Sequence, residues 1–465
     1  MASKIHQALL VLAFAFIYTA ETTPVAYGAF DNTETQISDD QFSGEYSKLT
    51  KAILLKSVEL ERFSLNFRLE HAGISNLQRL IFIGSQEAGA AGGLAFEITA
   101  LKEFNNGRHR LLSFHKQNVD RGLIAAEACS IIAASGSACA LGINALRSIK
   151  SYRHGYDARS ASKFISSHLK EIDSLLASRD ALVEAHKQNP AYERARIEGK
   201  ILHSMRSAFV NEYSNFRANT ASSATAFNLF LLQNIAYNTL GAVGAGLGRK
   251  ALEEPKLNGP SNIVFTISGA MAMAAPLLCS AQLHAQRKYL LNRNKKKFGF
   301  SETDLAELST QCKLLESAST EAGVGSLIPA LSSTKRMGIY SDASSRFVVQ
   351  LENETRTMEK LNKVALQTSF MGPAIGSLLM TQGILGTRGY YRYFPDRPKK
   401  QLDLSYKGAV CGTVGTSMAL VGNAAWLLAS LSYEHHLRKN HRLPAQLIRE
   451  RLKHLEDVEK EVLAI

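Results

Sequence analysis

Along this chain, hydrophobic residues are gathered in six long blocks, and charged residues lie mostly between them. Each block is close to the length of about 20 apolar residues that a helix needs to cross a bilayer. The fourth block is the most uniformly apolar and the sixth comes next, whereas amides weaken the third and fifth and two glutamates weaken the first. The six blocks are residues 80–101, 122–146, 226–248, 263–283, 364–385 and 408–431.

The blocks form three pairs, because a short polar stretch separates the two members of each pair. Short connections favour antiparallel helical hairpins, so we expect hairpins over about 80–146, 226–283 and 364–431. Between the pairs, apolar residues recur at three- and four-residue steps, as in amphipathic or coiled helices. This pattern predicts an all-α polytopic membrane protein with long amphipathic helices outside the bilayer. The predicted connections within the pairs are residues 102–121, 249–261 and 386–407.

The order of these elements indicates an internal repeat. Each hairpin follows a charged helix and precedes a basic cluster, a helix start and an amphipathic helix. The three helix starts are Asp157, Ser301 and Pro444, since Asp and Ser suit the residue before a helix and Pro suits its first turn. Their regular spacing gives a period of about 143 residues. The predicted units are residues 29–190, 191–335 and 336–465.

The N-terminus, residues 1–28, has the pattern of a signal peptide. Lys4 precedes a short apolar core, residues 8–20, and the stretch Ala26-Tyr27-Gly28 offers small residues at the cleavage positions. An uncleaved N-terminal anchor is the alternative, and either would send the chain through the secretory route to a plasma or inner membrane. The hairpin connections would then face the cytoplasm, and their basic residues agree with the positive-inside rule. Because the exported flanks are basic as well, charge alone leaves the orientation open.

Composition changes this picture little. The formal net charge of +13 is explained by Lys and Arg at membrane flanks, and we find no basic and aromatic surface that would suit nucleic acid. The cysteines form no CxxC pair and lie mostly in apolar blocks, which argues against a disulfide framework or a zinc site. They are Cys129, Cys139, Cys279, Cys312 and Cys411. An aromatic belt at the membrane surface is expected from Tyr390, Tyr391, Tyr393 and Phe394.

Three glutamates lie in the first predicted hairpin: Glu87, Glu97 and Glu127. A charge within the hydrocarbon costs about 3 kcal/mol on insertion scales, so such residues usually face partners or a water-filled path. In an antiparallel pair Glu97 and Glu127 would lie at similar depth near the cytoplasmic boundary, with Glu87 deeper. One interpretation is a proton or cation route. The other interpretation is structural: Lys102 and Arg121 reach Glu97 and Glu127, and Glu87 forms a hydrogen bond across the helix bundle. A further structural alternative is that the first pair of helices is a soluble hairpin packed on the others.

Glycine pairs with the spacing G-x-x-x-G occur in four of the six blocks. Between helices in lipid there is little hydrophobic drive, so close backbone approach supplies much of the packing. The pattern favours a tightly packed bundle or an oligomer. The candidate packing residues are Gly89, Gly93, Gly244, Gly248, Gly372, Gly376, Gly408 and Gly412.

Signals for catalysis are weak. The glycine-rich stretch from Gly244 misses the phosphate-loop spacing, and the C-terminal histidines around His436 lack an HExxH pattern. We therefore expect no enzyme, cofactor or metal site. The leading hypothesis is a structural or assembly protein that associates with itself or with another membrane protein through its amphipathic helices. The alternatives are a channel or transporter using the first-hairpin glutamates, and a secreted pore-forming or translocator-like protein with conditionally inserting hairpins.

Overall fold

The computed structural model describes residues 39–464, apart from 72–75, 190, 300–303, 322–329 and 441–442. The chain divides into two compact units, Met1–Phe42 and Ser43–Ile465, and everything that follows concerns the second. The predicted signal segment 1–28 and the predicted helix start Ser301 lie outside the described residues.

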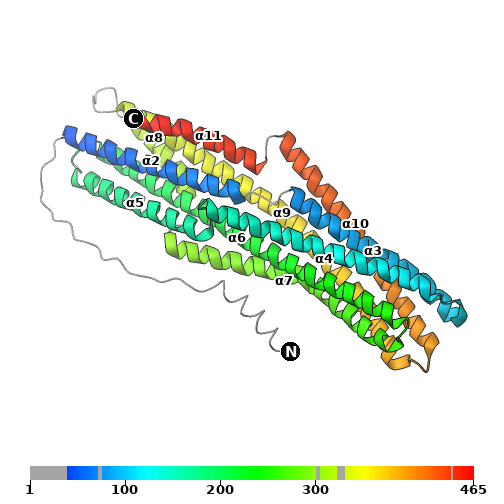
Figure 1. Ribbon diagram of the computed structural model, residues 1–465. Helices are drawn as coiled ribbons and strands as arrows, with labels where there is room; N and C mark the ends of the chain where they lie inside the picture. Colours follow the sequence, from blue (N-terminus) through cyan, green and yellow to red (C-terminus); the bar gives the residue numbers. More distant parts are fainter. Residues whose placement is uncertain are drawn as a thin grey trace. The chain divides into compact units, whose positions relative to one another are not determined.

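Every regular element in the described part of the chain is helical, which confirms the all-α prediction. The elements, drawn in Figure 1, are α2 (Asp39–His71), α3 (Asn76–His109), η1 (Leu111–Ser113), α4 (Lys116–Arg153), α5 (Ala158–Ala185), α6 (Tyr192–Ala251), η2 (Pro255–Leu257), α7 (Asn258–Phe298), α8 (Asp304–Glu321), α9 (Ala330–Tyr393), α10 (Pro398–Lys439) and α11 (Pro444–Leu463).

All six apolar blocks lie within helices, but the connections between paired helices are shorter than expected. α3 ends at His109 and α4 begins at Lys116, with only the turn η1 between them. α9 ends at Tyr393 and α10 begins at Pro398, which suits the first turn of a helix. The prediction took charged residues as the ends of helices. Lys, Arg and Glu are good helix formers, so charge marks a change of surroundings while the helix continues.

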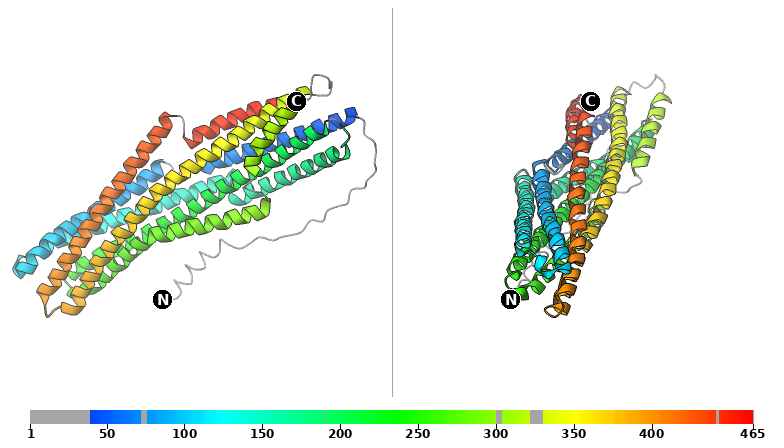
Figure 2. Two further views of the ribbon diagram at one scale, coloured as in Figure 1. Left: turned by 180° about the vertical axis from the view of Figure 1, so that it is seen from behind. Right: turned by 90° about the vertical axis from the view of Figure 1, so that its right-hand side faces the viewer.

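Helices α6 and α9 are much longer than the predicted elements, at 60 and 64 residues. Each joins a charged stretch and an apolar block, which we expected as separate helices, into one helix. Figures 1 and 2 show that α2, α5, α8 and α11 lie along the first part of these two helices, and α3, α4, α7 and α10 along the second part. We call α2, α5, α8, α11, residues 192–216 and residues 330–344 the outer-helix region. The hairpin region is α3, α4, α7, α10, residues 226–251 and residues 371–393.

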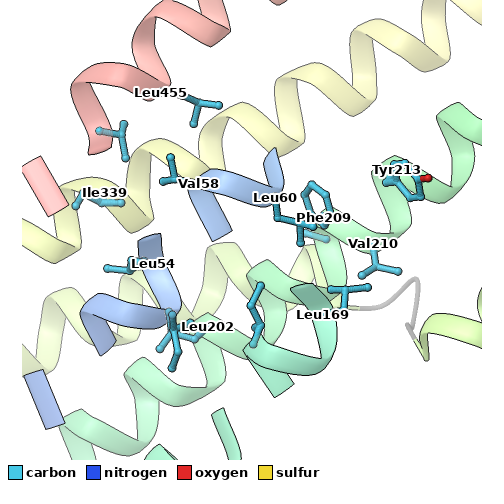
Figure 3. Packing of buried hydrophobic residues seen from close by; sticks show 14 of the residues in the cluster. Leu54, Val58, Leu60, Leu169, Leu202, Phe209, Val210, Tyr213, Ile339 and Leu455 are labelled. Atoms are coloured by element: carbon cyan, nitrogen blue, oxygen red, sulfur yellow. The ribbon is translucent and has the colours of Figure 1, made fainter. Parts of the chain in front are cut away.

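The outer-helix region has a continuous apolar core. In α5, Ile165, Leu169, Ile172 and Leu176 follow helical spacing and are at most 3% exposed. They belong to a cluster with residues of α2, α6, α8, α9 and α11 and with Phe298 at the end of α7. Figure 3 shows part of it, with Leu54, Ile339 and Leu455 among the labelled side chains. The apolar faces of the amphipathic helices are therefore covered within the chain itself.

The hairpin region has smaller buried apolar clusters, around Leu231 and Leu123, and exposes far more apolar surface. Large apolar side chains face outward, with Val421 and Leu428 67% and 68% exposed, while Ser137 and Asn234 inside are at most 1% exposed. Three stretches contain a helix that is long and apolar enough to cross a membrane by length and composition: Lys116–Ala185, Pro255–Phe298 and Pro398–Lys439. They contain the second block of each predicted pair. Among the described residues α3, α6 and α9 do not reach this limit, in line with the amides and glutamates that the sequence showed there.

Two of the predicted helix starts are found. The Asp157 carboxylate accepts hydrogen bonds from the backbone N–H groups of Arg159 and Ser160, at 2.9 and 3.2 Å, and so caps α5. Pro444 is the first residue of α11. Burial by itself would raise the pKa of Asp157, but the hydrogen bonds from Ser160 and Arg159 outweigh it and lower this pKa.

Candidate functional site

Glu97 lies where α3 meets α9 and α10, and it is 4% exposed. The Gln382 amide, from α9, donates a hydrogen bond of 2.5 Å to Glu97 Oε1. Gly412 of α10 lies directly against the carboxyl group, so that any side chain at this position would collide with it. The other oxygen, Oε2, is buried and has no hydrogen-bond partner within the part of the chain that the structure describes. One oxygen of this buried carboxyl group therefore accepts a hydrogen bond, and the other has no partner among the described residues.

Glu127 faces a different neighbour. Its carboxylate forms an ion pair of 2.9 Å with Arg249 of α6, and Arg249 also contacts Asp120 at 3.2 Å. The sequence suggested Lys102 or Arg121 as partners, and the pairing found is with Arg249 instead. About 30% of the Glu127 side chain is exposed, so this is a half-buried ion pair between α4 and α6.

Glu87 lies on α3 beside a polar contact between helices. Its Oε1 is buried and has no hydrogen-bond partner among the described residues, although the residue as a whole is partly exposed. Glu97 faces α9 and α10, while Glu127 faces α6. The structure thus directs the carboxylates of the first hairpin toward different helices, and Glu97 is the most deeply buried of the three.

Two sets of amides join the helices around these glutamates. Gln86 of α3 donates to the Ala133 carbonyl and to Ser137 on α4, and it accepts from Tyr237 and Asn238 of α6 at 3.3 Å. A second set joins Gln78, Asn144 and Asn228, from α3, α4 and α6. The sequence showed the amides of α6 only as a weakness of an apolar block. Their four-residue spacing at Asn234 and Asn238 is the signal that they share one inward face.

The eight predicted packing glycines all lie against a neighbouring helix. On α3, Gly89 lies against Ala133 of α4 and Gly93 against Thr416 of α10. On α6, Gly244 lies against Phe265 of α7, and Gly248 lies against Ser261 and Leu123. The other four lie on α9 and α10: Gly372 against Pro276, Gly376 against Met273, Gly408 against Gln382 and Gly412 against Glu97. Sequence reasoning missed Gly269, Gly383 and Gly386, which bring the backbones of α7 and α9 together. They were missed because no partner glycine stands four positions away.

The outer-helix region contains a buried cluster of charges that the sequence did not reveal. Glu198 of α6 accepts hydrogen bonds from Arg336 Nε at 2.8 Å and from the Tyr340 hydroxyl at 2.6 Å, both on α9. Arg179 of α5 lies 3.6 Å from the same carboxylate, and the Tyr46 hydroxyl of α2 bonds to it. Burial by itself would raise the pKa of Glu198, but the two guanidinium groups and the hydroxyls outweigh it, so the pKa is lowered.

A second buried cluster lies further along α6. Glu212 forms ion pairs with Arg68 of α2 at 2.9 Å and with Arg451 of α11 at 3.1 Å. Arg451 also pairs with Glu61 of α2. Burial raises and the two cations lower the pKa of Glu212, with a net shift downward. Together the two clusters tie four segments of α2, α5, α9 and α11 to the first part of α6.

Outside these clusters, the side chains that could take part in catalysis or metal binding are dispersed over the described part of the chain. Within the described ranges no three His, Cys, Asp or Glu side chains gather in a way that could hold a metal ion. Of the C-terminal histidines, His454 pairs with Asp342 at 2.9 Å. The fold and these sites define the chain as an all-helical protein with three helices able to cross a membrane. Neither the known protein-family models nor the curated proteins include a match to it.

Proposed function

We propose that the chain is a non-enzymatic integral membrane protein with a structural or assembly function. In this proposal the hairpin region lies in the bilayer and the outer-helix region stands beside it in water. The observation that supports it is the apolar outer surface of the hairpin region, together with the polar groups buried between its helices. Val421 and Leu428 are exposed on α10, whereas Asn234 and Glu97 are buried between helices. Exposed apolar and buried hydrogen-bonded surfaces are the arrangement that a hydrocarbon environment requires.

Basic residues at both ends of the apolar helices support the same placement. On α4, Arg121 and Arg147 flank the apolar block, and on α7 the block is followed by Arg287 and Lys288. Arg121 and Arg147 lie roughly 39 Å apart along the helix at 1.5 Å per residue. That length fits a bilayer with its headgroup layers, about 40–45 Å thick, where Lys and Arg meet lipid phosphates.

The proposal includes the threefold unit and the export expected from the sequence. Each unit would consist of an outer helix, a membrane hairpin and a second outer helix, so that all the outer helices share one side of the membrane. The element order α2 to α5, α6 to α8 and α9 to α11 supports this division. Since the apolar faces of the outer helices are packed inside the chain, a partner would bind their charged outer faces.

An alkaline carbonate wash of membranes from cells that express the full chain tests the placement. Immunoblotting of pellet and supernatant should find the protein in the pellet, because carbonate releases peripheral proteins and leaves embedded helices in lipid. Recovery in the supernatant would overturn the proposal. A water-soluble secreted pool that binds liposomes only after a trigger would instead favour conditionally inserting hairpins.

A second candidate function is a proton or cation route through the hairpin region. Its support is Glu97, whose buried Oε2 has no partner among the described side chains and faces the glycine surface at Gly412. Purified protein in liposomes with a pH or cation gradient should then carry a flux that Glu97→Gln abolishes. Glu127→Gln is the matched control, because that carboxylate pairs with Arg249 and faces α6. Absence of flux in the parent protein would rule this function out.

A further inference from the structure

An apolar groove of about 320 Å³ runs between α7 and α9 near the turn that joins α9 to α10. Ile263 and Ile267 of α7 line one wall, and Ile384 of α9 lines the other. These three side chains are 39%, 47% and 46% exposed, so the groove opens on the outer surface of the hairpin region. Its lining spans two helical turns on α9, or roughly 10 Å at 1.5 Å per residue.

The two helices approach each other closely beside this groove. Gly383 of α9 lies against Thr266, and Gly386 lies against Asn262, both on α7. The hydroxyl groups of the two lining threonines donate to their own helices, Thr266 to the Asn262 carbonyl and Thr387 to the Gly383 carbonyl. Because those donors are used, the walls present mainly methyl and methylene groups.

The two ends of the groove differ in chemistry. The paired positions of α7 and α9 place Ile267 beside Ile384, away from the turn, whereas Arg388 and Tyr391 lie toward the turn. Arg388 is exposed, and the Tyr391 side chain is 63% exposed. No acidic side chain lines the groove in the part of the chain that is described. An apolar trough therefore ends at a guanidinium group and a phenol, both of which donate hydrogen bonds.

We propose that this groove binds one anionic phospholipid, with an acyl chain against Ile263, Ile267 and Ile384 and the headgroup phosphate at Arg388 and Tyr391. The inference rests on the proposed membrane placement of the hairpin region. A guanidinium group matches phosphate in charge and geometry, and Tyr is favoured at the level of headgroups. The basic residues in and after the adjoining turn, Arg397, Lys399 and Lys400, add to the positive field there.

Native mass spectrometry of the full chain in detergent tests the site. The probes are dioleoyl phosphatidylglycerol and dioleoyl phosphatidylcholine at equal concentration, since they share acyl chains and differ in headgroup charge. The wild-type protein should retain one phosphatidylglycerol in preference to phosphatidylcholine. Arg388→Gln should reduce that retention about tenfold, because a charge-assisted hydrogen bond to phosphate is lost. Ile384→Asn should reduce retention of both lipids, because it places an amide in the acyl-chain wall.

The matched control is Arg392→Gln, one turn further along α9. Arg392 is exposed, lies over the ring of Tyr393 and is not part of the groove. It should leave the preference for phosphatidylglycerol unchanged. Equal loss in both Arg variants, or no preference in the wild-type protein, would overturn the inference. If the protein stays in the carbonate pellet while the preference is absent, only the lipid site fails, whereas release by carbonate removes the membrane placement itself.

Discussion

The two regions of this molecule use α6 and α9 in opposite ways. In the outer-helix region, residues such as Val210 and Ile201 are buried in an apolar core and most charged groups face water. In the hairpin region, the same α6 buries Asn234 and Asn238, and Phe265 of the neighbouring α7 packs on Gly244. One continuous helix thus packs on a large apolar core in its first part and exposes apolar side chains such as Leu232 in its second part. A helix can therefore continue without a break from one environment into another.

The buried charges sharpen this contrast. In the outer-helix region Glu198 and Glu212 are each shared between two arginines, so burial is balanced by charge. In the hairpin region Glu97 is buried with an amide as its hydrogen-bond donor. The first arrangement holds ionised carboxylates between helices. The second provides a carboxyl group that contacts no cation in the part of the chain that the structure describes, which is why we propose it for a proton or cation route.

The largest expected effect comes from breaking the first charge cluster with Glu198→Gln. Removing the carboxylate leaves Arg336 buried without its counter-charge and leaves Arg179 only the longer contact of 3.7 Å to Asp180, which should lower the free energy of unfolding by about 3–5 kcal/mol. Denaturation of the detergent-solubilised protein measures it. Glu184→Gln on α5 is the control, because its pair with Lys187 is at the surface and should have little effect. Equal stability of both variants would contradict a structural role for the cluster.

A lysine on the apolar outer surface should break the membrane placement. Val421→Lys lies near the middle of the last apolar block and should make insertion of α10 less favourable by about 3 kcal/mol. The fraction of protein that stays in the membrane pellet after a carbonate wash measures this loss of insertion. Leu463→Lys in α11, where the parent leucine is 56% exposed, is the matched control and should leave retention unchanged. If both variants stayed fully in the pellet, Val421 would not face lipid.

The glycine contacts between α7 and α9 give a smaller effect. Gly269→Ala places a methyl group against the backbone of Met380, so the two helices must separate, at about 1–3 kcal/mol. Gly142→Ala on α4 meets nothing within 4 Å and should instead stabilise its helix, by about 0.5–1 kcal/mol. Thermal unfolding in detergent compares the two. Changes of the same sign would show that helix propensity, rather than close packing, decides both sites.

The smallest expected effect is at the cap of α5. Asp157→Ala should cost about 1 kcal/mol at pH 7 through the lost hydrogen bonds to the backbone. Because folding lowers the pKa of Asp157, its contribution is complete above the unfolded value of about 3.9 and is lost as the pH falls through the folded value. Unfolding measured from pH 7 down to pH 2 should show the two proteins converging.

Asp157→Asn separates the two parts of that prediction. The amide oxygen can still accept from the backbone of Arg159 and Ser160, but the side chain no longer titrates. This variant should retain most of the cap and lose the pH dependence that comes from residue 157. A stability difference between the wild-type protein and Asp157→Asn that stays constant across this acid range would contradict the lowered pKa of Asp157.

Much of the architecture was determined by the sequence alone. Helical periodicity predicted the all-α class, and all six apolar blocks lie in helices because each offers a consistent surface to its surroundings. Local chemistry predicted the start of α5 at Asp157 and of α11 at Pro444, since a cap depends on residues within one turn. The block at 263–283 was correctly ranked as the most apolar, because hydropathy is a property of a single helix, whereas the block at 408–431 is less apolar than the one at 122–146, which we had ranked below it.

Contacts between distant residues were decided only by the tertiary structure. Gln382 bonds to Glu97 across 285 positions, and Arg336 bonds to Glu198 across 138. Such pairs depend on how far one helix slides and rotates against another, which small side chains such as Gly412 determine at the contact. The same cause explains why Arg249, rather than a residue near in sequence, pairs with Glu127. The carboxylates could be identified from the sequence, but their partners depend on how separate helices pack against one another.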